Sequence, residues 1–121
     1  MGEAGMTNEQ VFAMSFARVY PMLIAKAERK GRSRDEVHAV TAWLTGYSNG
    51  QLEELLNSDI TYGGFFRNAP AMNPARKKIT GSVCGVKVET IEDPLMREIR
   101  YLDKLVDELA KGKPMEKILR K

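Results

Sequence analysis

Few residues in this sequence have side chains suited to covalent or acid–base catalysis. The sequence contains one cysteine, Cys84, and one histidine, His38. A thiol and an imidazole that meet in the folded chain can act as a nucleophile and its general base, so one hypothesis is a small enzyme that uses Cys84. The simpler interpretation is a small buried thiol and a half-exposed histidine on a helix. We favour this second interpretation and predict no catalytic residue.

Sites for metals, cofactors and phosphate groups also lack their usual residue patterns. Zinc sites need a cluster of Cys and His ligands, which one residue of each type cannot supply. The segment 81–85 holds two glycines, but it lacks the Gly-x-Gly-x-x-Gly spacing, a preceding strand and the lysine of a phosphate loop. We therefore predict no metal and no cofactor, and the sequence leans against an enzyme.

The aromatic residues are concentrated in one part of the chain. Five of the nine lie between positions 43 and 66, and they are Trp43, Tyr47, Tyr62, Phe65 and Phe66. Together with two adjacent glycines, these rings could line a ligand pocket or a groove for a partner. They could equally form a corner of the core beneath a loop, and the pattern favours the core. These five are our candidates for ligand or partner binding.

Basic residues form blocks that suggest an alternative function, sequence-tolerant binding of nucleic acid. The net charge is only +3, but basic residues gather in residues 26–34 and 76–78, whereas residues 35–60 contain five acids and no Lys or Arg. Such blocks can attract an anionic partner, although solvated helix faces are the simpler interpretation. The candidate residues for nucleic acid are Arg29, Lys30, Arg32, Arg34, Arg76, Lys77 and Lys78.

A helix-turn-helix that reads DNA is a weaker hypothesis. The turn Thr45-Gly46-Tyr47 has the glycine expected between two such helices. The second helix, however, would offer Glu53 and Glu54 to the groove without any Lys or Arg, and carboxylates repel the phosphate backbone. We interpret this segment as an ordinary corner between two helices.

Capping residues, prolines and glycines divide the chain into short helices. Capping boxes begin at Thr7 and Ser33, Ser48 caps a further helix, and Asn-Pro and Asp-Pro pairs at 73–74 and 93–94 begin two more. Pro21 should kink or break the first helix. The predicted core positions of that helix are Phe12, Phe16, Val19, Leu23 and Ala27. We predict a mainly α fold of five to six short helices around one core, with one short strand or hairpin near residues 83–91.

The β-branched run at residues 83–91 also bears on self-association. A single strand leaves a row of backbone donors and acceptors unpaired. It can either fold back as a small hairpin or pair with its twin across a two-fold axis. Mainly for this reason, we expect a homodimer that serves as a binding or interaction module.

The length and composition suit one domain in a reducing compartment. We predict a flexible leader at residues 1–6 and a single helical domain at residues 7–121. The sequence contains no long apolar run of membrane-spanning length and no secretory signal pattern, so we expect no membrane association. The single cysteine fits a cytoplasmic protein.

Several longer motifs resemble an uncharacterised prokaryotic family, domain of unknown function 2200 (DUF2200). They are Tyr20-Pro21 and the segments 43–47, 69–74, 79–81, 84–85, 92–96, 99–105 and 115–120. The resemblance runs from about Met6 to the C-terminus. It implies a stand-alone cytoplasmic bacterial protein of about this length, and it carries no activity, substrate or catalytic residue that could be transferred.

Overall fold

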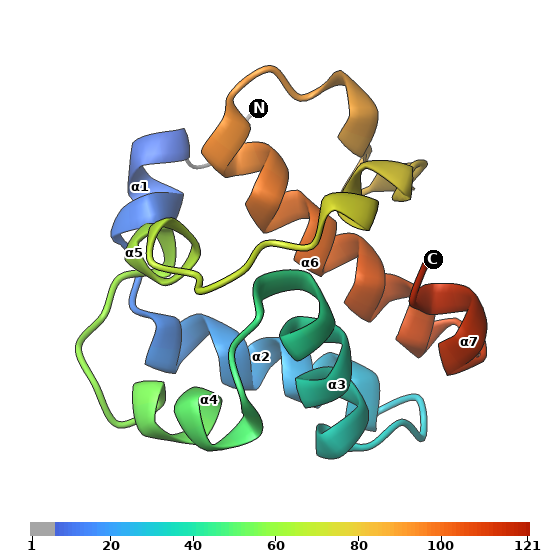
Figure 1. Ribbon diagram of the computed structural model, residues 1–121, viewed down its shortest axis with the longest axis horizontal. Helices are drawn as coiled ribbons and strands as arrows, with labels where there is room; N and C mark the ends of the chain where they lie inside the picture. Colours follow the sequence, from blue (N-terminus) through green and yellow to red (C-terminus); the bar gives the residue numbers. More distant parts are fainter. Residues whose placement is uncertain (1–6) are drawn as a thin grey trace.

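The computed structural model describes residues 7–121, so the leader predicted for residues 1–6 lies outside the described residues. The α-helices are, in chain order, α1 (Asn8–Ala13), α2 (Phe16–Glu28), α3 (Arg34–Thr45), α4 (Asn49–Leu55), α5 (Tyr62–Arg67), α6 (Pro94–Ala110) and α7 (Met115–Ile118) (Figure 1). Between α5 and α6 lie two 3-10 helices, η1 (Pro74–Lys78) and η2 (Val88–Thr90), and a hairpin of β1 (Ser82–Val83) and β2 (Val86–Lys87). The predicted fold class, mainly α with a short hairpin, is confirmed.

Helix α6 is the element around which the others pack. It runs diagonally through the molecule in Figure 1 and contacts α2, α3, α5, α7 and the hairpin region. Its residues Ile99, Leu102, Val106 and Leu109, at spacings of three and four, are buried, and Leu105 widens the buried face. A helix with such a wide apolar face can pack on several neighbours at once, which explains its central position.

The predicted helix starts are confirmed by their hydrogen bonds. Thr7, Ser33 and Ser48 each form a complete capping box. Asp93 accepts from the backbone N–H of Met96 at the start of α6. Gly46 ends α3 with a left-handed φ of +83°, the conformation that favours glycine at this position.

The first helix breaks at a different place from the one predicted. Pro21 lies inside α2, and the break falls at Met14 and Ser15 instead. Its cause is a contact with a distant segment: the N–H of Phe16 donates to the Ile60 carbonyl at 3.0 Å, and the N–H of Tyr62 donates to the Met14 carbonyl at 2.6 Å. These bonds take the place of helical hydrogen bonds at Met14 and Phe16. The position of the break is therefore set by the contact with residues 60–62 and not by Pro21.

The break also moves the buried stripe of α2. The buried residues are Phe16, Tyr20, Ile24 and Ala27. Of the predicted stripe, Phe12, Val19 and Leu23 are only partly buried, because α1 and α2 do not continue one helical repeat. Trp43, also predicted for the core, is half-buried on α3.

The strand near residues 83–91 folds back on itself. Ser82 pairs with Lys87 and Val83 with Val86, and the turn residues Cys84 and Gly85 have φ angles of +54° and +79°. Positive φ at both central residues is the signature of a type I′ hairpin turn. Of the two alternatives, the strand therefore folds back as a hairpin. Residues 82–87 contain no unpaired strand of the kind that suggested a homodimer. The homodimer itself stays a prediction.

Candidate functional site

Four of the five predicted aromatic residues lie in the core. Tyr47, Tyr62, Phe65 and Phe66 are at most 7% exposed, and Phe65 stacks with Phe16 and Tyr47 at centroid distances of 4.2 and 4.6 Å. These rings therefore form the core corner that the pattern favoured. A role of the whole group in binding stays a prediction, and only part of it, Tyr62 above all, also lines an open pocket.

The predicted burial of Cys84 and the predicted half-exposure of His38 are both wrong. Cys84 is exposed, because it occupies the tip of the hairpin turn. His38 is 3% exposed, because α2 and α4 cover that face of α3. The two ring nitrogens of His38 bond to Tyr20 and Glu53, so the imidazole is engaged by residues other than Cys84.

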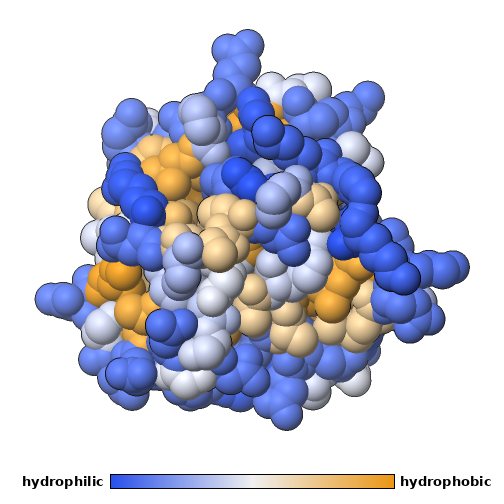
Figure 2. Space-filling model, viewed as in Figure 1, coloured by the Kyte–Doolittle hydropathy of each residue, from blue (hydrophilic) through white to orange (hydrophobic). Residues whose placement is uncertain are grey.

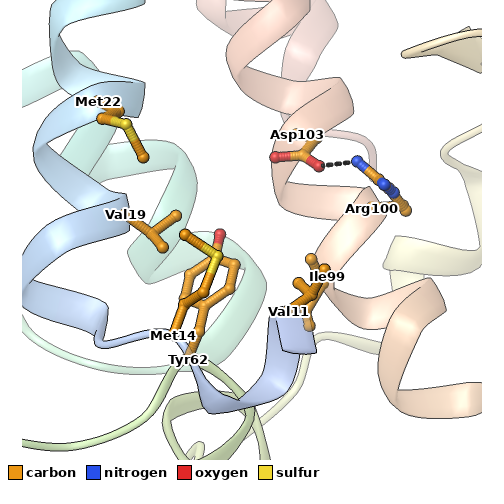
Figure 3. A pocket seen from close by; sticks show the side chains of 8 residues that line it. All are labelled: Val11, Met14, Val19, Met22, Tyr62, Ile99, Arg100 and Asp103. Atoms are coloured by element: carbon orange, nitrogen blue, oxygen red, sulfur yellow. Dashed lines mark hydrogen bonds and ion pairs between the residues drawn. The ribbon is translucent and has the colours of Figure 1, made fainter. Parts of the chain in front are cut away.

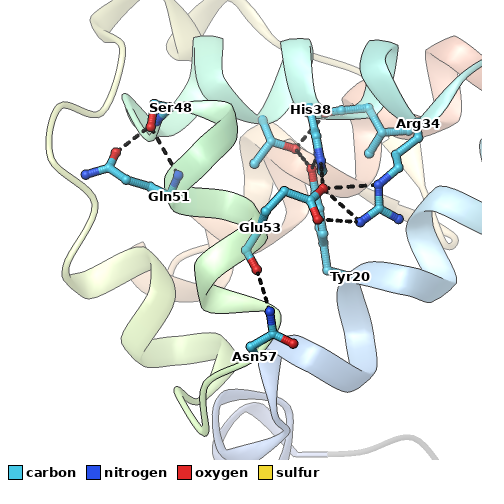
Figure 4. A network of polar contacts seen from close by, with 9 residues as sticks. Tyr20, Arg34, His38, Ser48, Gln51, Glu53 and Asn57 are labelled. Carbon is cyan, nitrogen blue, oxygen red and sulfur yellow. Dashed lines mark hydrogen bonds and ion pairs between the residues drawn. The ribbon is translucent and has the colours of Figure 1, made fainter.

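His38 belongs to a polar network that joins α2, α3 and α4 (Figure 4). The Tyr20 hydroxyl donates to Thr41 Oγ1 at 3.1 Å and lies 2.8 Å from His38 Nδ1. The other ring nitrogen of His38, Nε2, lies 2.6 Å from Glu53 Oε2. Arg34 binds the same carboxylate at 2.8 Å. The network locks three helices together.

This network explains the acidic residue that argued against DNA reading. His38 and Arg34 hold the pKa of Glu53 below its ordinary value by hydrogen bonding to its carboxylate. Burial raises the pKa of Tyr20. Glu53 therefore forms ion pairs within the chain. The sequence gave no indication of these pairs, because the partners His38 and Arg34 are 15 and 19 residues away.

The predicted basic blocks divide into paired and exposed residues. Arg32 binds Glu36 and the carbonyls of Leu109 and Lys113 at the end of α6. Arg34 and Arg76 form ion pairs with Glu53 and Glu98. Arg29, Lys30, Lys77 and Lys78 are exposed, as is the paired Arg34, and Lys78 donates to the Lys121 carbonyl. Nucleic-acid binding stays a prediction, with a smaller free positive charge than the sequence suggests.

An open pocket lies where α1, α2 and α6 meet above Tyr62 (Figure 3). Its volume is about 370 Å³, within the range of roughly 300–1,000 Å³ typical of ligand sites. We call it the Tyr62 pocket, and its lining residues are Val11, Met14, Val19, Met22, Tyr62, Ile99, Arg100 and Asp103.

Three polar side chains line the Tyr62 pocket: Arg100, Asp103 and Tyr62 itself. Arg100 Nη1 donates to Asp103 Oδ2 at 2.8 Å, and the other carboxylate oxygen of Asp103 turns toward α2 in Figure 3. The Tyr62 hydroxyl is buried and has no hydrogen-bond partner among residues 7–121. Burial raises the pKa of Asp103 despite the nearby Arg100, and burial followed by the charge of Asp103 raises the pKa of Tyr62.

The helix break creates this pocket. The Met14 carbonyl accepts the N–H of Tyr62, so α1 turns away from α2 and leaves the space that Met14, Val19 and Tyr62 line. Sequence reasoning missed the site because it continued one helix through this point. The available signal was Ser15, which caps α2 by accepting from the N–H of Arg18.

Comparisons with known proteins place the chain in a family. The model of an uncharacterized protein family conserved in bacteria, DUF2200, matches residues 10–120. The chain belongs to the DUF2200 family. The protein in the solved structure 'Crystal structure of uncharacterized protein SP1917' is 53% identical in sequence to this DUF2200 chain. The two structures superpose with a TM-score of 0.90, and the match covers 95% of this chain and 94% of that one. No curated protein matches the chain.

Figure 2 shows one face of this DUF2200 protein. On the face drawn in Figure 2, apolar atoms form separate patches between charged residues. Within residues 7–121, no helix combines the length and the apolar character needed to cross a membrane.

Proposed function

We propose that this DUF2200 protein is a small binding module that holds an amphipathic ligand in the Tyr62 pocket. The observation that supports it is the Tyr62 side chain, which lines the pocket and whose buried hydroxyl has no partner among the described residues. Burying a hydroxyl without a hydrogen bond costs about 1–3 kcal/mol. A ligand that bonds to this hydroxyl would recover that free energy, and phenylalanine at this position could not offer the same bond.

The apolar walls suit the other part of such a ligand. Met14, Val19 and Met22 form one side, and Ile99 lies opposite on α6. Methionine side chains are unbranched and adapt to differently shaped apolar groups. Met22 is 53% exposed, which is unusual for a large apolar side chain and fits a residue at the mouth of a binding site.

The test follows the ε-methyl resonances of methionine by ¹³C NMR while 1-hexanol is added. Met14 and Met22 line the pocket, whereas Met115 lies on α7 and serves as an internal control. We expect saturable shifts of the Met14 and Met22 resonances without a shift of Met115.

A pocket-filling variant separates this binding from nonspecific contact. Val19→Trp should fill the pocket and abolish the shifts, whereas Arg18→Trp, at an exposed neighbouring position on the same helix, should leave them intact. Thermal unfolding checks that both variants are folded. If 1-hexanol shifts no pocket methionine, or if Val19→Trp binds it as well as the wild type does, the proposal is wrong.

The homodimer is the second part of the proposal and has less support. The homodimer was expected mainly because a lone strand needs a partner, and β1 instead pairs with β2 of the same chain. Met22 and Val86 are the large apolar side chains with clear exposure among the described residues, at 53% and 41%. They are the positions at which a contact between two copies would bury apolar surface.

A further inference from the structure

The hydrogen-bonding groups of the Tyr62 pocket specify what kind of polar group the ligand carries; this inference rests on the proposed function. Within residues 7–121, the Tyr62 hydroxyl lacks a partner, and Arg100 bonds only to Oδ2 of Asp103, leaving Oδ1 facing the pocket. The hydroxyl proton needs an acceptor, and the carboxylate oxygen needs a donor. We infer that the ligand is a neutral amphiphile whose polar group both donates and accepts, that is, a hydroxyl or a primary carboxamide.

Charged head groups fit these two positions less well. An ammonium has donors only, so it would leave the Tyr62 proton without an acceptor. A carboxylate has acceptors only and would face the carboxylate of Asp103. In both cases one polar group of the site stays unsatisfied, which is the costly outcome in a buried site.

The charge balance of the site points the same way. Arg100 and Asp103 form an ion pair and cancel each other, with side chains only 25% and 17% exposed. Lys26, whose charge also acts on Asp103, is itself paired with Asp107 at 3.5 Å. A charged ligand would thus enter an apolar pocket without a free counter-charge, and burying an unpaired charge is far more expensive than burying a neutral hydroxyl.

Four probes with the same six-carbon chain test the inference: 1-hexanol, hexanamide, hexylammonium and hexanoate. Each is titrated while the Met14 and Met22 methyl resonances are followed. We expect 1-hexanol and hexanamide to bind at least about tenfold more tightly than either ion, a difference equivalent to one unsatisfied polar group. Tyr62→Phe should weaken the binding of 1-hexanol by about tenfold, because it removes the hydroxyl that donates to the ligand.

A substitution that changes only the charge reverses the predicted order. Asp103→Asn keeps the side-chain shape and leaves Arg100 without its anionic partner, so hexanoate should become the tightest of the four probes. Asp35→Asn is the matched control: it makes the same change of charge at an exposed position in the first turn of α3, and Asp35 does not line the pocket. It should preserve the wild-type order.

The outcomes separate this inference from the proposed function. If all four probes bind equally well and Val19→Trp still blocks them, the pocket binds ligands but the assigned chemical class is wrong. The same holds if an ion binds most tightly to the wild type, or if Asp103→Asn leaves the order unchanged. If no probe shifts Met14 or Met22, both the inference and the proposed function are wrong.

Discussion

Replacement of Tyr62 by phenylalanine removes one oxygen atom from the molecule and should stabilise it. The hydroxyl is buried and has no partner within residues 7–121. In the folded protein it therefore lacks the hydrogen bonds that water supplies in the unfolded chain. Phenylalanine keeps the ring and its edge-to-face contact with Phe66 at 5.2 Å, so the substitution removes the penalty and retains the packing.

The size of the effect follows from the cost of an unsatisfied buried hydroxyl. That cost is about 1–3 kcal/mol, and Tyr62→Phe should raise the free energy of unfolding by about 1 kcal/mol or more. For a domain of this length, 1 kcal/mol corresponds to a shift in Tm of about 3–6 °C. Most substitutions in a core destabilise a protein, so a rise in Tm is a distinctive outcome.

Tyr47→Phe is the matched control, because it removes the same atom from a tyrosine in the same aromatic cluster. The Tyr47 hydroxyl donates to the Phe65 carbonyl at 2.7 Å. This carbonyl lies in the last turn of α5, where helical acceptors lack a partner in the helix. Tyr47→Phe should therefore lower the free energy of unfolding by about 1–2 kcal/mol.

Urea unfolding of the wild type and both variants, followed by circular dichroism without added ligand, measures the two effects. The expected result is opposite signs for the two substitutions. If Tyr62→Phe destabilises the protein as much as Tyr47→Phe, then the Tyr62 hydroxyl is satisfied in the free protein, and the argument for the pocket loses its main support. A stabilising Tyr62→Phe that also weakens hexanol binding would show a residue kept for binding at a cost in stability.

Three further predictions concern the fold and the assembly. Arg32 and the N–H of Ser33 hold the pKa of Glu36 at about 2, below its ordinary 4.5, so its contribution to stability is present above pH 4.5 and is lost as the pH falls toward 2. In urea unfolding, the difference in the free energy of unfolding between wild type and Glu36→Gln should shrink over that range. A difference that does not change with pH would contradict this. Gly46→Ala should lower the free energy of unfolding by clearly more than the roughly 1–2 kcal/mol of left-handed strain, because its Cβ would lie 2.8 Å from the Ala71 nitrogen. In Gly112→Ala the new Cβ meets nothing within 4 Å, so this substitution should cost only the strain. Equal losses of stability in thermal unfolding would refute the clash at Gly46. Light scattering at micromolar concentration should give twice the 13.6 kDa monomer mass, and a monomer mass would end the homodimer proposal.

Local signals in the sequence were enough to predict most helix ends. The capping boxes at Thr7 and Ser33, the cap at Ser48 and the Asp93-Pro94 start were all confirmed, because a cap and its partner lie within three residues of each other.

Features that depend on distant contacts could not be predicted in the same way. The burial of His38 depends on Tyr20 and Glu53, which lie 18 and 15 residues away. The exposure of Cys84 depends on which two residues occupy the hairpin turn, and that was undecided until the pairing register of the strands was known. The sequence pattern showed that these residues were unusual in type, but it did not show their surroundings.

The Tyr62 pocket lies where local and distant requirements conflict. The apolar spacing from Phe12 to Phe16 favours one continuous helix, yet the Met14 carbonyl bonds to the Tyr62 N–H and the chain breaks there. The same two residues line the pocket, and one of them carries the unpartnered hydroxyl. Natural sequences agree with their folds at most positions, and departures from that agreement concentrate at functional sites. Met14 and Tyr62 show two such departures, one in helix continuity and one in hydrogen bonding, and their meeting in one cavity is why we propose this cavity as the ligand site.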